Sequence, residues 1–137
     1  MPTRILIADD HEVMRSVLRH LLDSHEGWQV CSEAKNGGEA VAKAADLRPD
    51  VIVLDLAMPI MDGVQAAREI LKSRPEAVVV MFTLHSSEQL ERTAAQVGVK
   101  RVISKAHNGS RLLSAIEELL AELPKRSAAG HVHRTNL

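Results

Sequence analysis

The chain has 137 residues, enough for one domain and too few for two of ordinary size. Its 17 basic and 18 acidic residues nearly cancel, which excludes a general attraction to nucleic acid or to anionic membranes. Aromatic residues make up 1% and the only cysteine is Cys31, so base-stacking surfaces, an intramolecular disulfide and a cysteine-based zinc site are excluded. The sequence shows no signal peptide and no apolar run that could span a bilayer, so we expect a cytoplasmic protein without a membrane partner.

Short apolar segments alternate along the chain with longer amphipathic ones. The apolar segments predict strands at residues 5–8, 28–34, 51–54, 77–82 and 101–104. Successive positions of the third and fourth segments are apolar, which indicates parallel strands covered by helices on both faces. The second segment is the most polar and is predicted to be an edge strand.

The amphipathic segments carry apolar residues at spacings of three and four, which is typical of helices packed on a core. They predict helices around residues 13–22, 40–47, 64–71, 90–97 and 112–123. Three pairs of residues have the spacing of helix-start signals: Asn36 with Glu39, Asp62 with Gln65, and Ser86 with Gln89.

Five strand–helix units in succession predict an α/β fold, an open parallel sheet with helices on both faces. The pattern ends at residue 123, so residues 1–123 are predicted to be one domain. Residues 124–137 carry basic side chains and no acidic ones, and are predicted to be a linker, a flexible tail or a cloning remnant.

Chemically suitable residues follow four of the predicted strands. Asp9 and Asp10 follow the first strand, Asp55 the third, Thr83 the fourth and Lys105 the fifth. Carboxylates that meet at one sheet edge repel one another unless a cation intervenes, and Mg²⁺ prefers such oxygen ligands. With a phosphoryl group held by the lysine and the threonine, one carboxylate could act as nucleophile and form an acyl phosphate. The simpler alternative is that Asp10 only caps the following helix.

Four stretches of this sequence resemble the receiver domain of two-component response regulators. They are residues 5–11 (ILIADDH), 53–63 (VLDLAMPIMDG), 82–83 (FT) and 104–105 (SK). The resemblance covers roughly residues 3 to 123 and is strongest to regulators that carry a helix-turn-helix DNA-binding output domain. It implies a flavodoxin-like (βα)5 doubly wound sandwich with a parallel sheet of order 2-1-3-4-5.

The resemblance also implies a role for each candidate residue. Asp55 would be the phosphoacceptor, receiving the phosphoryl group from a sensor histidine kinase. Thr83 would bind the phosphoryl oxygens and draw in the loop that follows it, and Lys105 would pair with the phosphoryl group. The implied Mg²⁺ ligands are Asp10, Asp55 and the backbone carbonyl of Ala57, with Asp9 acting through water.

Four positions depart from the usual pattern of this family. Many receivers place an aromatic switch residue three positions before the lysine, where this chain has Val102. Leu84 replaces the usual small residue after the threonine, and its bulk could narrow the entrance to the site. Ala106 replaces the common proline after the lysine, so a trans peptide bond is expected there. His85 stands at a position that tunes phosphoryl lifetime in the family, although an exposed loop histidine without a role is the slightly favoured interpretation.

The hypothesis that follows is a phosphorylation-controlled signalling switch, the receiver part of a transcriptional regulator, and not an enzyme in the ordinary sense. One alternative is a stand-alone single-domain regulator that acts by protein–protein contact. A haloacid-dehalogenase-like phosphatase is a distant alternative, because it needs a second aspartate where this chain has Ala57. A nucleotide binder would need a phosphate loop in place of the acidic pair. A homodimer through the fifth helix, alone or together with the first helix, is an open expectation, and DNA would be bound only through an output domain outside these residues.

Overall fold

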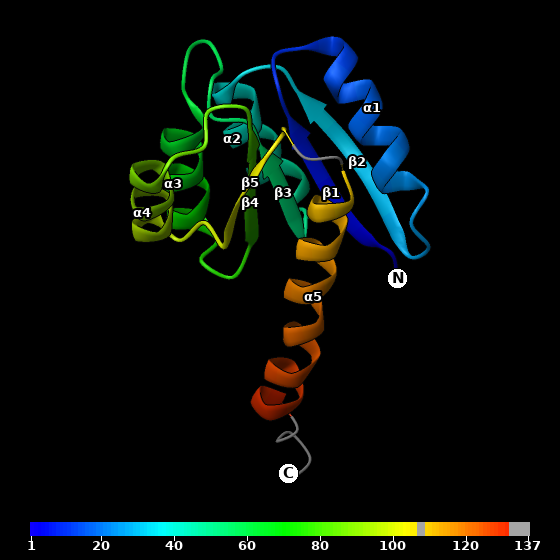
Figure 1. The fold of residues 1–137 in the computed structure, drawn as a ribbon. Coiled ribbons are helices and arrows are strands. Elements are labelled where there is room, and N and C mark those ends of the chain that lie inside the picture. Colours follow the sequence, from blue (N-terminus) through cyan, green and yellow to red (C-terminus); the bar gives the residue numbers. More distant parts are fainter. Residues whose placement is uncertain (107–108, 132–137) are drawn as a thin grey trace.

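The computed structural model describes residues 1–106 and 109–131, with backbone only for residues 124–131. Its five strands form one parallel sheet in the order β2-β1-β3-β4-β5 (Figure 1), which confirms the flavodoxin-like architecture. The strands are β1 (Thr3–Ala8), β2 (Trp28–Ala34), β3 (Val51–Leu54), β4 (Val78–Thr83) and β5 (Arg101–Ser104). β2 lies at an edge of the sheet, as its polar sequence predicts.

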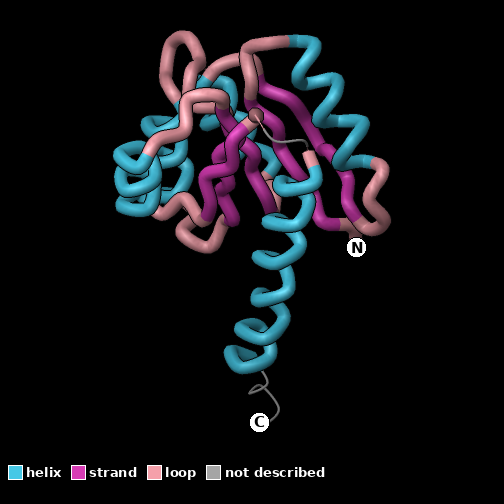
Figure 2. The backbone as a smooth tube through the Cα atoms, in the orientation of Figure 1, coloured by secondary structure: helices cyan, strands magenta, loops and turns pink. Residues whose placement is uncertain are grey.

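Helices cover both faces of the sheet (Figure 2). They are α1 (Glu12–Asp23), α2 (Gly37–Leu47), α3 (Gly63–Ser73), α4 (Glu88–Val97) and α5 (Ser110–His131). α1 and α5 pack on one face through Leu18, Leu22 and Ile116, and α2, α3 and α4 pack on the other. β3 and β4 are buried along their whole length because both faces are covered, as their continuous apolar sequences predict.

The helix-start signals hold at two of the three predicted positions. Asp62 and Gln65 form a reciprocal capping box at the start of α3, and the Asn36 side chain accepts a hydrogen bond at the start of α2. The third prediction is wrong by one residue. Ser87, and not Ser86, caps α4, because Ser87 has the extended backbone of a cap residue and its hydroxyl accepts from Leu90 N at 3.0 Å.

α5 continues beyond its predicted end at residue 123. The helix runs to His131 and projects past the edge of the sheet (Figure 1), although the apolar periodicity stops eight residues earlier. Residues 132–137, the rest of the predicted tail, lie outside the described residues. Among the described helices, none has both the length and the apolar character needed to cross a membrane.

The turn between α1 and β2 is connected to α5 by an imidazole. His25 Nε2 lies 2.9 Å from Glu117 Oε2, and the His25 ring stacks on Trp28 with 3.6 Å between ring centroids. The hydrogen bond to Glu117 raises the pKa of His25 above its ordinary value of 6.5, against a smaller lowering by burial. A protonated His25 therefore strengthens the attachment of α5.

We expect this contact to make stability depend on pH. Because the pKa of His25 is raised on folding, its stabilising contribution is complete below the unfolded value of 6.5 and is lost as pH rises through the folded value. Glu117→Gln should therefore lower the free energy of unfolding more at about pH 5.5 than at about pH 9, measured by urea denaturation. Glu118→Gln is the matched control, since its partner Arg101 stays charged at both pH values. An equal loss at both pH values for Glu117→Gln would contradict the linkage.

The start of α3 lies directly against the backbone of Asp55, the residue after β3. Gly63 N donates to Leu56 O at 2.8 Å, and a Cβ atom on Gly63 would lie 2.2 Å from the Asp55 carbonyl oxygen. Only glycine leaves room for this approach. The spacing between Asp55 and the start of α3 is therefore set by backbone contact.

Gly63→Ala should displace the Asp55 backbone and lower the free energy of unfolding by about 1–3 kcal/mol, the usual range for an overpacked core. Gly38→Ala is the matched control, because its Cβ would meet nothing closer than 3.3 Å. We expect the control to stay within about 0.5 kcal/mol of the parent protein. Urea denaturation midpoints compare the two variants, and equal stability of both would show that the Asp55 carbonyl can move without penalty.

Candidate functional site

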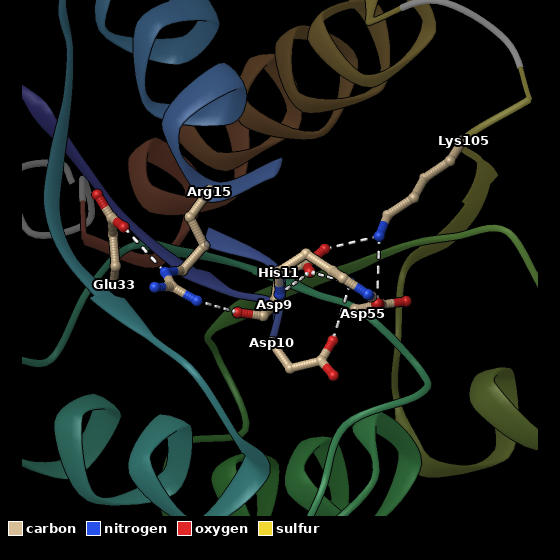
Figure 3. Close-up of polar contacts among 7 residues, drawn as sticks. All are labelled: Asp9, Asp10, His11, Arg15, Glu33, Asp55 and Lys105. Carbon is tan, nitrogen blue, oxygen red and sulfur yellow. Dashed lines mark hydrogen bonds and ion pairs between the residues drawn. The ribbon is translucent and has the colours of Figure 1, made fainter. Parts of the chain in front are cut away.

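Three charged side chains meet at the carboxyl edge of the sheet (Figure 3). Lys105 Nζ donates to Asp9 Oδ2 at 2.6 Å and to Asp55 Oδ2 at 3.1 Å. All three side chains are more than nine-tenths buried. The parallel topology thus brings the residues that follow β1, β3 and β5 into direct contact, although Asp9 and Lys105 are 96 positions apart in the sequence.

The pKa of Lys105 reflects two opposing effects. Burial is the largest single effect and lowers the pKa. The hydrogen bond to Asp9 and the negative charges of Asp55 and Asp9 together raise it by more, so the pKa of Lys105 lies above its ordinary value. Lys105 is therefore a permanent cation at neutral pH. A single ammonium does not balance two buried carboxylates, so the centre keeps a negative charge.

Asp55 has one oxygen that the surrounding protein does not satisfy. Within the described residues, its Oδ1 is the one buried side-chain oxygen or nitrogen without a hydrogen-bond partner. Leaving a buried acceptor unpaired costs about 1–3 kcal/mol, and more when it is charged. Such an atom is usually explained by an ion, a ligand or a reactive role.

Asp10 and His11 complete the edge of the site. One ligand atom each from Asp9, Asp10, His11 and Asp55 lie within 4.8 Å of one another. Asp10 does not cap α1, because His11 occupies the cap position and no side chain there makes a capping hydrogen bond. The three carboxylates, one of which is Asp55 with its unpaired oxygen, are a donor set that fits a hard divalent cation.

A cavity of about 310 Å³ leads from solvent to Asp55. Its lining includes Ala57, Lys105, Leu84 and His85, and Leu84 is itself exposed to solvent. Thr83 is not among the lining residues and is fully buried at the end of β4. Its hydroxyl accepts a hydrogen bond from His85 N at 3.1 Å, which ties the loop after β4 to the threonine.

An ion-pair network holds Asp9 from the side of β2. Arg15 Nη1 donates to the Asp9 carbonyl at 2.8 Å, and its Nε donates to Glu33 Oε1 at 3.1 Å. Arg19 Nε donates to the other Glu33 oxygen at 2.5 Å, and this bond chiefly lowers the pKa of Glu33. Sequence reasoning missed this network, because these residues carry no shared spacing or motif.

His11 is a second residue of the site that sequence reasoning left without a role. Its backbone N–H donates to Asp9 Oδ1 at 2.9 Å, and its Nδ1 lies 3.1 Å from Asp10 Oδ1. The available signal was its position directly after the acidic pair.

The Lys105–Ala106 peptide bond is trans, as the sequence predicts, and so is every other peptide bond in the described residues.

Comparisons with known proteins match this chain along most of its length. Residues 5–117 match the family described as "Response regulator receiver domain". The chain is 34% identical over 119 residues to "Chemotaxis protein CheY" of Thermotoga maritima, covering 87% of this chain and 98% of that protein. It is 36% identical over 118 residues to "Response regulator protein VraR" of Staphylococcus saprophyticus, covering 86% of this chain but 56% of that protein.

A similar solved structure is a "CheX-CheY-BeF3-Mg+2 complex" from Borrelia burgdorferi, with a TM-score of 0.83 and 29% identity. The alignment covers 88% of this chain and 90% of that chain. Receiver domains and their CheY-like relatives are signalling proteins and not enzymes in the ordinary sense. With a family match over most of its residues and the same sheet order, this chain belongs to the response regulator receiver domain family.

Proposed function

We propose that this protein is a phosphorylation-controlled switch in which Asp55 accepts a phosphoryl group from a sensor histidine kinase. The observation that carries the proposal is the state of the Asp55 carboxylate. One of its oxygens is held by Lys105, the other is buried and unpaired, and Asp55 lines a cavity of about 310 Å³. A carboxylate in this position has a free nucleophilic oxygen and a fixed orientation.

In the proposed transfer, the bond between phosphorus and the kinase histidine nitrogen breaks as a bond forms from phosphorus to Asp55 Oδ1. The product is an acyl phosphate, the electron pair of the broken bond stays on the histidine nitrogen, and the ring leaves as neutral imidazole because its other nitrogen carries a proton in the donor. Lys105 remains next to the new phosphoryl group and offsets part of its negative charge. The chemistry needs little beyond alignment and neutralisation of charge, and the residues around Asp55 supply both.

Mg²⁺ is the cofactor we propose for this transfer. Asp10, Asp55 and the backbone carbonyl of Ala57 would hold it, with Asp9 acting through water. A bound Mg²⁺ supplies positive charge that neutralises the phosphoryl oxygens. Support comes from the fit of the carboxylate set to a hard cation, and from the Borrelia burgdorferi relative, whose complex contains Mg²⁺.

We propose that the switch acts through the loop after β4. Thr83 is buried and its hydroxyl binds His85 N, so a phosphoryl group that recruits this hydroxyl would release or move the loop. Val102 lies on β5, half-buried, and packs against the core between the sheet and α2–α4. A valine cannot swing between buried and exposed positions as a ring does, so the response is proposed to pass through the loop backbone.

The relatives suggest two kinds of protein in which this receiver domain could act. The chain spans about half of VraR, which favours the receiver part of a longer transcriptional regulator, with DNA bound by another domain. It spans nearly the whole of CheY, which favours a single-domain regulator that acts on protein partners. We propose the first setting and keep the second as the alternative, and a homodimer through α1 and α5 stays a prediction.

Phosphorylation at Asp55 can be tested by intact-protein mass spectrometry. With Mg²⁺ and acetyl phosphate, the parent protein should gain the mass of one phosphoryl group, and Asp55→Asn should gain none because the amide is not nucleophilic. Asp46→Asn, an exposed aspartate on α2, is the matched control and should be phosphorylated normally. Thermal protection by beryllofluoride should likewise require both Mg²⁺ and Asp55. Equal labelling of Asp55→Asn, or no labelling of the parent with several donors, would refute the proposal.

Leu84 should limit access to Asp55. Its side chain is 67% exposed and lines the cavity entrance, so Leu84→Ala should widen the path for small donors and for water. We expect phosphorylation by acetyl phosphate and loss of the phosphoryl group each to accelerate about two- to tenfold, equivalent to roughly 0.4–1.4 kcal/mol in the barrier. Ile60→Ala is the control, being also exposed but outside the cavity lining. Unchanged rates in Leu84→Ala would show that the entrance is not limiting.

A further inference from the structure

Asp9 is held by a hydrogen bond at each of its polar groups. Its carboxylate oxygens accept from Lys105 Nζ at 2.6 Å and from His11 N at 2.9 Å, and its own N–H donates to Ala34 O at 3.0 Å. The remaining group is the main-chain carbonyl, whose oxygen accepts from Arg15 Nη1 at 2.8 Å (Figure 3). Arg15 is thus the residue that fixes the main chain where it leaves Asp9.

The bond from Arg15 also restricts the next residue, Asp10. The carbonyl group of Asp9 and the nitrogen of Asp10 belong to one planar peptide unit, so a donor that holds the oxygen sets the orientation of the whole plane. The Asp10 side chain is 32% exposed, and its neighbour His11 is 73% exposed, whereas the Asp9 side chain is 1% exposed. Packing therefore confines Asp10 much less than Asp9, and the main chain is what ties its carboxylate to the buried centre.

Arg15 is itself held in place from the edge strand β2. Its Nε donates to Glu33 Oε1 at 3.1 Å, and the other Glu33 oxygen accepts from Arg19 Nε at 2.5 Å. Lys43 donates to the main-chain carbonyl of Glu33, so both the side chain and the backbone of this glutamate are anchored. Because a guanidinium is rigid and planar, the pair with Glu33 also sets the direction in which Arg15 Nη1 points.

We propose that Arg15 is a positioning residue for phosphoryl transfer, which holds the Asp9–Asp10 peptide so that the Asp10 carboxylate stays in place beside Asp55. The inference rests on the proposed function, in which Asp10 and Asp55 hold Mg²⁺. Arg15 acts through a main-chain oxygen and through Glu33, and not through the reacting atoms. The edge strand β2, which supplies none of the site residues, thereby takes part in ordering the site.

Charge and positioning predict opposite effects when the guanidinium is removed. A positive charge near a bound cation repels it, so the loss of this charge alone would tighten Mg²⁺ binding. The loss of a partner that orients metal ligands weakens binding, by about 10- to 100-fold where such partners have been removed. Arg15→Met removes the charge and both donors but keeps an apolar side chain. We expect it to weaken Mg²⁺ binding to the full chain by about tenfold, measured by calorimetry.

Arg74→Met is the matched control, because Arg74 makes the same kinds of contact at the opposite, amino edge of the sheet. Its Nη1 donates to Pro49 O at 2.7 Å, its Nε lies 3.4 Å from a Glu76 oxygen, and its side chain is 13% exposed against 16% for Arg15. The control should keep the parental Mg²⁺ affinity. Urea denaturation without Mg²⁺ should give similar midpoints for the two variants, which separates positioning from a general loss of stability.

Labelling by acetyl phosphate at increasing Mg²⁺ gives a second measurement. In Arg15→Met, the Mg²⁺ concentration for half-maximal labelling rate should rise about tenfold, and the maximal rate should stay within about twofold of the parent, because saturating Mg²⁺ restores the arrangement. Glu33→Gln is a milder second variant, since an amide oxygen accepts a weaker hydrogen bond from Arg15 than a carboxylate does. It should shift the Mg²⁺ dependence in the same direction by a smaller factor.

Two results would overturn the inference. One is Mg²⁺ binding in Arg15→Met as tight as in the parent or tighter, which would leave Arg15 acting through its charge or not at all. The other is an equal loss of Mg²⁺ affinity in Arg74→Met, which would show only a general loosening of the fold. In both cases the parent protein is still labelled at Asp55, and the proposed function stands. Absence of labelling in the parent would instead refute the proposed function itself.

Discussion

The ammonium of Lys105 bridges two carboxylates from different strands, and the rest of the site is arranged around this contact. Burying Asp9 and Asp55 side by side without a cation would be strongly unfavourable, since each charge loses its hydration and repels the other. The bridge is available only when β5 has paired with β4 and β1 lies beside β3, because these pairings bring position 105 over the other strands. The charged centre therefore depends on the pairing of β1, β3, β4 and β5.

Close contacts fix the backbone of the two aspartates that Lys105 bridges. Arg15 binds the carbonyl of Asp9, and the absence of a side chain at Gly63 lets α3 begin against the carbonyl of Asp55. Between Asp55 and α3, Ile60 has φ 73°, a left-handed conformation that is strained for a β-branched residue. Strain of this kind persists only where the surroundings over-determine the loop, and the close contact of the Met61 backbone with Gly37 shows such a constraint.

The sequence predicted the sheet and the residues at its carboxyl edge because both follow from local patterns. Apolar segments of strand length, joined by helices, force parallel strands, and parallel strands place the residues that follow them on one edge. Asp9, Asp55 and Lys105 could be placed in this way. Contacts between side chains of different elements, such as Arg15 with Glu33 or His25 with Glu117, leave no periodic trace and could not be predicted. Ser86 and Ser87 are equally good cap residues by residue type. The start of α4 depends on the backbone conformation of the preceding loop, which the local sequence pattern does not specify.

Charge balance connects the resting site to the proposed switch. Three carboxylates beside one ammonium leave an excess negative charge that a divalent cation would balance, and one oxygen of the Asp55 carboxylate is unpaired. A phosphoryl group carries roughly two negative charges but replaces the charge of the Asp55 carboxylate, so the site gains about one negative charge, which Lys105 and such a cation no longer neutralise alone. Further donors in the proposed switch would be the Thr83 hydroxyl and the backbone N–H groups of the loop after β4, and His85 N is bound to Thr83 in this structure. In the proposed switch, recruiting them would require that hydrogen bond to rearrange, so the added charge would move the loop between β4 and α4.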